Sequence, residues 1–224
     1  MLLRTAVADD ADGLADLIYL ADLAHYTTSG YALSIGGTKE HQLAEIAKLV
    51  SADARSPFHF THFDVAEVPD GSIAASVAGF DRTETDPQMI PALEEIGWDA
   101  HTIEQLTERI GPVAACVPEQ HERAWTIEHV ATLPLYRGQG LAPRLLARAL
   151  ARGAERGYGQ ATVDVFIGNS KARAIYEAAG FTKTCEFGHG PMREILGRDA
   201  VERMMRPLAG TILAGTIKGL AQLN

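Results

Sequence analysis

The sequence predicts an α/β fold with one helical insertion. Three observations support this prediction. Along the chain, the apolar residues change between the 3.6-residue period of helices and the two-residue period of strands. The turn signal Pro-Asp-Gly at residues 69–71 separates two strand-like runs. From residue 125 onward the order is strand, turn, helix, strand, helix.

The first half of the chain is expected to contain a strand, two helices and a β-hairpin. Residues 2–7 form a short strand candidate, and a helix with apolar residues at i, i+3, i+4 and i+7 follows it. A loop with three glycines at 26–38 leads to a second helix over 40–51. Residues 58–80 then change to a strand-like period on both sides of the turn, which predicts a hairpin.

Residues 81–121 are expected to be a helical insertion, because this segment is too long for a hairpin loop. Within it, Gly97 and Gly111 are expected to end two helices. The remaining elements expected from the residue pattern are strands over 125–133 and 160–167, helices over 140–156 and 171–179, and a final pair of strands over 182–187 and 201–208.

Composition and charge limit the function classes. The 224 residues are 46% hydrophobic and 22% charged, which is typical of a soluble globular protein. The formal net charge of −9 argues against a nucleic-acid partner. No apolar run approaches the ~18 residues that can span a bilayer, and the N-terminus lacks a signal-peptide pattern. We therefore expect a cytoplasmic protein with no membrane partner.

The cysteines and histidines do not predict a metal site. Cys116 and Cys185 form neither a disulfide framework nor a metal-finger spacing. The histidines, His59 and His62 among them, have no metal-ligand pattern. We therefore expect no metal.

The stretch YRGQGLAPRLL, residues 136–146, places two glycines and an arginine before an apolar-periodic helix. Glycine permits close backbone approach, and a helix N-terminus binds anions. A nucleotide-hydrolysing loop would need lysine and Ser/Thr where this chain has Leu141 and Ala142. A dinucleotide turn would need a third glycine or alanine where the chain has a proline. The remaining pattern, R-x-x-G-x-A filled by Arg137, Gly140 and Ala142, predicts a turn that holds a pyrophosphate.

Two coupled motifs resemble the GNAT superfamily of acyl-CoA-dependent N-acyltransferases. VATLPLYRGQGLAPRLL is followed by DVFIGNSKARAIYEAAGF, with turn, helix, strand, asparagine, helix, tyrosine and Gly-Phe in the family's order. The resemblance covers roughly residues 125–187, and the start of the chain also resembles the family's opening. It implies one domain over residues 1–224 with a mixed, largely antiparallel sheet flanked by helices. The insertion at about 81–121 and a C-terminal extension at about 208–224 are not covered by it.

The resemblance implies that acetyl-CoA is the co-substrate and that a V-shaped gap between the strands at 125–133 and 160–167 holds it. The extended pantetheine arm can pair with a splayed strand edge. The residues that the resemblance and the turn assign to acetyl-CoA are Val130, Ala131, Thr132, Arg137, Gly138, Gln139, Gly140, Leu141, Ala142, Arg144, Asn169 and Tyr176.

The helix after the turn carries an arginine at every fourth position: Arg144, Arg148, Arg152 and Arg156. We expect this row to be a solvated helix face, except for Arg144, which lies within one turn of the glycines. Lys171 and Arg173 open the next helix and are candidates to meet the 3′-phosphate of coenzyme A.

Attack of an amine on a thioester needs a neutral amine, a stabilised oxyanion and a proton for the thiolate. By the resemblance, Tyr176 is the general acid and the backbone N–H of Val130 is the oxyanion donor. Glu128 is the expected general base, and a structural ion pair is its alternative role. His129 is expected to point to the opposite face, because side chains alternate along a strand.

Two functions remain open. The first is an N-acetyltransferase that transfers the acetyl group of acetyl-CoA to a primary amine of a small molecule or peptide by direct attack. The second is a non-catalytic acyl-CoA sensor or regulatory module. Tyr176 and Glu128 favour catalysis, because a sensor need keep only the glycine turn. The acceptor site is expected among the early helices, the insertion and the final strands, and a homodimer is left open as the assembly.

Overall fold

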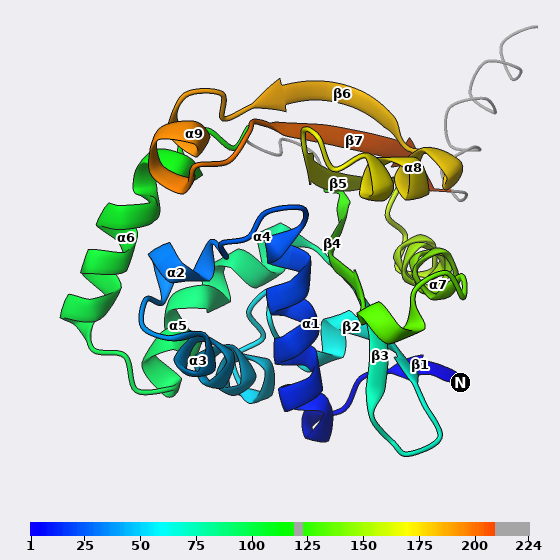
Figure 1. The fold of residues 1–224 in the computed structure, drawn as a ribbon, viewed down its shortest axis with the longest axis horizontal. Helices are drawn as coiled ribbons and strands as arrows, with labels where there is room; N and C mark the ends of the chain where they lie inside the picture. The colour runs from blue at the N-terminus through cyan, green and yellow to red at the C-terminus, as the bar shows by residue number, and fades with distance from the viewer. Residues whose placement is uncertain (119–122, 209–224) are drawn as a thin grey trace, which may run out of the picture.

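The computed structural model describes residues 1–118 and 123–208. One seven-stranded sheet crosses the molecule, with helices on both of its faces (Figure 1). Its strands are β1 (Leu2–Thr5), β2 (Phe63–Glu67), β3 (Ile73–Phe80), β4 (Trp125–Thr132), β5 (Gln160–Phe166), β6 (Thr182–Phe187) and β7 (Val201–Pro207). The spatial order is β1-β2-β3-β4-β5-β7-β6, and β4–β5 is the one parallel pair among the described strands. The predicted mixed, largely antiparallel sheet is confirmed.

The helices are α1 (Ala11–Leu23), α2 (Tyr31–Ser34), α3 (Lys39–Ser51), α4 (Arg82–Thr85), α5 (Met89–Glu95), α6 (Ala100–Ala114), α7 (Leu141–Glu155), α8 (Ser170–Ala178) and α9 (Pro191–Leu196). Apolar residues of α1 and α3 form one core with the sheet, and those of α7 form another. Figure 1 shows α1 and α3 on one side of β4 and α7 on the other. The sheet is thus covered on both faces, as an α/β fold requires.

Trp125 holds α7 closely against β4. Its Nε1 donates to the backbone carbonyl of Ala149 over 2.9 Å. Glycines make room for the indole, because a Cβ on Gly79 or Gly153 would lie 2.6 or 2.5 Å from it. Such close packing fixes the helix that begins at the glycine turn.

Strands β4 and β5 pair over only their first residues. Trp125, Thr126 and Ile127 align with Ala161, Thr162 and Val163. The register ends there, so the C-terminal halves of the two strands diverge. The predicted gap between these strands is confirmed.

Most predicted elements lie within one or two residues of their expected positions, and three differences stand out. The loop at 26–38 contains the short helix α2, and α9 was not predicted. Helix α6 continues through Gly111 instead of ending there. A glycine ends a helix by taking a positive φ, and Gly111 does not take one.

The described part of the insertion is helical, as predicted, and contains α4, α5 and α6. Helix α6 contacts both α2 and α9. The C-terminal extension expected from about residue 208 lies almost wholly outside the described residues. Over the described ranges, none of the helices combines the length and apolar character needed to cross a membrane.

Candidate active site

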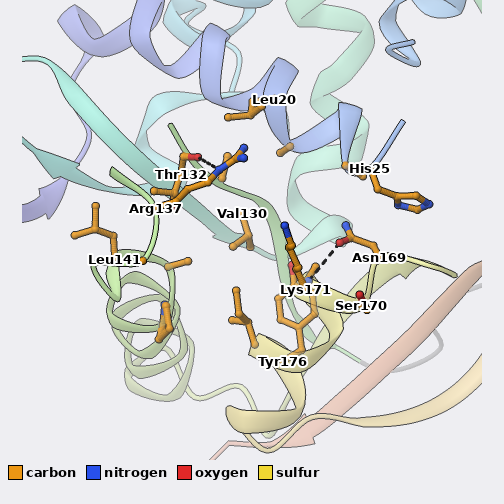
Figure 2. Close-up of a pocket in the computed structure, with 18 of the residues that line it drawn as sticks. Leu20, His25, Val130, Thr132, Arg137, Leu141, Asn169, Ser170, Lys171 and Tyr176 are labelled. Carbon is orange, nitrogen blue, oxygen red and sulfur yellow. Dashed lines mark hydrogen bonds between the residues drawn. The ribbon is translucent and has the colours of Figure 1, made fainter. Parts of the chain in front are cut away.

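A cavity of about 690 Å³ lies between α1, β4, the glycine turn and the start of α8 (Figure 2). This volume is within the ~300–1,000 Å³ of ligand pockets. The predicted acetyl-CoA residues that line it are Val130, Ala131, Thr132, Arg137, Gly138, Gly140, Leu141, Ala142, Asn169 and Tyr176. Gln139 and Arg144 are exposed and do not line it. The structure therefore brings together most of a set that the sequence spreads over three segments.

The glycine turn opens toward this cavity. Gly138 and Gly140 have φ angles of 78° and 68°, a region that favours glycine. A Cβ added to either residue would meet nothing within 4 Å. Arg137 Nε donates to the carbonyl of Thr132 over 3.2 Å, which ties the turn to the end of β4. Gly140 is the N-cap of α7, so the turn presents a helix N-terminus suited to an anion.

The start of α8 forms the opposite wall. Asn169 caps this helix, because its Oδ1 accepts from the N–H of Ala172 over 3.3 Å. Lys171 lines the cavity. Arg173 instead forms ion pairs of 2.9 Å with Glu177 and 3.0 Å with Glu202. Of the two basic residues, Lys171 is thus the one placed to meet a phosphate.

The expectation that the arginine row of α7 is a solvated face is wrong for Arg152, whose side chain is 21% exposed, while Arg148 is 45% exposed but also pairs with a buried carboxylate. Arg148 Nε lies 2.8 Å from Oδ1 of Asp64, and Arg152 Nη2 lies 3.4 Å from Oδ2. Asp64 is fully buried on β2, and a buried carboxylate needs a charged partner. Burial lowers the pKa of Arg152. The two arginines therefore hold α7 on the sheet.

Tyr176 is buried and lines the cavity from α8 (Figure 2). Its ring meets that of Phe181 edge-on, with centroids 6.0 Å apart. Burial first, and then the charge of Glu128, raises the pKa of Tyr176 above its ordinary value. The hydroxyl is therefore protonated at neutral pH, as a proton donor must be.

A bulge in β4 brings Glu128 and His129 to the same place. His129 has a φ of 50°, and the register between β3 and β4 shifts at this point. Ser76 Oγ donates to the His129 carbonyl over 3.1 Å. Nε2 of His129 lies 3.7 Å from Oε2 of Glu128. The prediction that His129 points away from Glu128 is wrong, because a bulge interrupts the alternation of side chains.

Glu128 also forms an ion pair with Arg82 of α4, from Nη2 to Oε1. The charge of Glu128 is the largest cause that raises the pKa of Arg82. On the other side, Arg82 Nη1 lies 3.6 Å from Oδ2 of Asp86, whose pKa is raised by burial. Sequence reasoning missed Arg82, because it lies 46 positions before Glu128 and within the insertion.

Elsewhere in the described part of the chain, no group of three or more His, Cys, Asp or Glu side chains could hold a metal ion. Cys116 and Cys185 are both free.

Residues 71–181 match the model of the acetyltransferase (GNAT) family. The matched segment contains the β4 edge, the glycine turn, Asn169 and Tyr176, which are the main walls of the cavity. These features define an acyl-CoA-dependent N-acetyltransferase, an enzyme that acetylates amines. The chain belongs to the GNAT superfamily.

Solved structures of acetyltransferases share this fold. An N-acetyltransferase from Staphylococcus aureus Mu50 is 20% identical, with a TM-score of 0.69 over 92% of this chain and 100% of that one. A spermidine N-acetyltransferase from Vibrio cholerae is 16% identical, with a TM-score of 0.53 over 93% and 95%. A phosphinothricin acetyltransferase from Sinorhizobium meliloti, in complex with acetyl-CoA, is 15% identical, with a TM-score of 0.51 over 92% and 88%. A comparison with curated protein sequences gave no match.

Proposed function

We propose that the 690 Å³ cavity holds acetyl-CoA and that the acetyl group passes by direct attack to the primary amine of an acceptor. One observation carries this proposal. The unpaired edge of β4, the open glycine turn, the N-terminus of α8 and a buried tyrosine all border one space. Each of these features suits a different part of acetyl-CoA or a different step of the transfer.

The binding roles follow from the backbone. Residues 130–132 pair with the pantetheine amides along the strand edge that β5 leaves open. The turn from Arg137 to Ala142 binds the pyrophosphate through its N–H groups, that of Gln139 included. The absence of side chains at Gly138 and Gly140 leaves room for the phosphates. Asn169 binds a CoA amide beside its capping role.

The catalytic roles follow from protonation and position. Glu128 takes a proton from the attacking amine, directly or through water, while Arg82 holds its carboxylate in place. The Val130 N–H stabilises the oxyanion as the N–C bond forms. Tyr176 donates its proton to the sulfur as the C–S bond breaks, and its raised pKa keeps that proton available. The products are the acetylated amine and the free thiol of coenzyme A.

A free-thiol release assay with acetyl-CoA and a panel of primary amines tests this function. Amine-dependent thiol release is expected, and Glu128→Gln should lower kcat by ~10²–10⁴-fold where chemistry limits the rate. Glu67→Gln is the matched control, because Glu67 is similarly exposed (27% against 24%), is also paired with an arginine, Arg4, and lies on β2 between β1 and β3. Acetyl-CoA binding by calorimetry without thiol release for any amine would instead support a sensor.

A further inference from the structure

A second cavity, of about 210 Å³, lies beside the last turn of α1. Asp22 of α1 lines this cavity, while Ala21 of the same helix and His25, two residues after its end, line the first. Two helices supply its outer walls, one from the insertion, where the sequence places part of the acceptor site, and one that the residue pattern did not predict. These are α6 of the insertion and α9, which contact each other and lie together beyond α2 in Figure 1.

The walls are apolar. Helix α6 contributes Ile110 and Val113, α9 contributes Met192 and Leu196, and Phe166 at the end of β5 closes the side toward the sheet. Cavities with this kind of lining favour apolar groups, because burial removes the apolar surface of both partners from water.

The two charged residues that line this cavity neutralise each other. Nη2 of buried Arg198 lies 3.1 Å from Oδ2 of Asp22. Asp22 also accepts from the Ser29 hydroxyl over 2.7 Å and from the Gly30 N–H over 2.6 Å. The other lining residues among the described ones are uncharged. The walls that residues 1–118 and 123–208 form thus offer no unpaired charge to a second ammonium or to a carboxylate.

Aromatic contacts connect this cavity with Glu128. The ring of Tyr31, which lines the cavity, lies 6.2 Å from that of Phe58, and Phe58 lies 5.6 Å from His129. His129 in turn adjoins Glu128. Burial, then the charge of Asp22 and then that of Glu128 raise the pKa of Tyr31, and burial followed by the charge of Glu128 raises the pKa of Tyr176. Glu128 is thus within electrostatic reach of one tyrosine from each cavity.

We propose that the second cavity holds the apolar body of the acceptor, so that the preferred substrate is a monoamine with a compact aliphatic or aromatic group. This inference rests on the proposed function. The volume lies below the ~300 Å³ of the smaller ligand pockets, which limits the bound group to a compact one. A diamine or polyamine would bury a second ammonium without a partner, and that is costly.

A substrate series tests the proposed class. Linear alkylamines and phenylalkylamines are compared with diamines of equal length in the thiol-release assay. We expect kcat/KM to rise roughly fourfold for each buried methylene until the cavity is full. Diamines should fall at least about tenfold below the matched monoamines. A preference for diamines, polyamines or peptide amines would overturn the inference, whereas absence of thiol release with every amine would overturn the proposed function.

Variants of the cavity wall provide the second test. Val113→Phe fills the cavity, and Val117→Phe is the matched control at an exposed position four residues later. Val113→Phe should lower kcat/KM for the longest good alkylamine by at least about tenfold. It should leave ethylamine turnover and acetyl-CoA affinity unchanged, and the control should leave all three unchanged.

Leu33→Phe on α2 fills the cavity from another wall. This variant replaces Val113→Phe in the test if Val113→Phe lowers the melting temperature. The inference is overturned if the wall variants do not change the length preference. It is also overturned if they reduce ethylamine and long-amine turnover equally while acetyl-CoA still binds.

Discussion

Arg82 and Glu128 form an ion pair that joins the helical insertion to the centre of the sheet. Arg82 is the first residue of α4. Glu128 directly follows Ile127, the last residue of β4 that pairs with β5. The insertion therefore positions a carboxylate at the point where the two strands separate, beside the proposed site of acetyl transfer.

We expect Arg82→Met and Glu128→Gln to be coupled in their effect on stability. The two side chains are 31% and 24% exposed, so their attraction is less screened than that of a surface pair. A double-mutant cycle in urea should give a coupling free energy of about 1–2 kcal/mol. Arg193 and Asp199, which are 75% and 47% exposed, provide the control cycle, for which we expect below ~0.5 kcal/mol. Equal coupling in the two cycles would contradict the prediction.

Tyr176→Phe should lower kcat by ~10²–10⁴-fold with almost unchanged acetyl-CoA affinity and melting temperature. The substitution removes the hydroxyl and keeps the ring against Phe181. Tyr158→Phe is the control, because its hydroxyl donates to Asp81 over 2.9 Å inside the fold. That variant should lose about 1–2 kcal/mol of stability and keep its turnover. Normal turnover of Tyr176→Phe, with chemistry shown to limit the rate, would exclude the acid role.

Gly140→Val should weaken acetyl-CoA binding about 10- to 100-fold. The added side chain would stand where the pyrophosphate approaches the turn, so charge-assisted hydrogen bonds from the backbone N–H groups would be lost. Gly157→Val is the control at the other end of α7. Both glycines have a positive φ, 68° and 81°, and a Cβ on either would meet nothing within 4 Å. The backbone strain of about 1–2 kcal/mol is therefore similar in the two variants. Calorimetry that finds the same affinity for both would remove the turn from the binding site.

Stability should fall as the pH is lowered because of His62. Burial is the largest cause that lowers its pKa from 6.5 to about 4. As the pH falls between these two values, the unfolded chain binds more protons than the folded one, so the free energy of unfolding decreases. We expect His62 to account for a loss of about 2 kcal/mol between about pH 8 and about pH 5.

Urea unfolding at both pH values measures this effect. His62→Gln should reduce the pH dependence, whereas His101→Gln on the exposed face of α6 should retain that of the wild type. A pH dependence of His62→Gln that equals the wild-type one would show that another group is responsible.

The sequence by itself determined the features that depend on neighbouring residues. The hairpin around Asp70 and Gly71 and the start of α7 after Gly140 were both predicted. Each follows from backbone and hydrogen-bond preferences that act within a few residues. The sequence also predicted that the glycine turn and Tyr176 belong to one site, because the two motifs that contain them lie in one continuous stretch of the chain.

The tertiary structure alone decided the features that depend on contacts between distant segments. The bulge at His129 arises from the register of β4 against β3, which no residue of β4 reveals by itself. Arg82 meets Glu128, and Arg148 meets Asp64, across 46 and 84 positions. The second cavity likewise exists only where α1, α6 and α9 come together. Local preferences carry no information about which distant side chains will share a buried space, so packing settled these features.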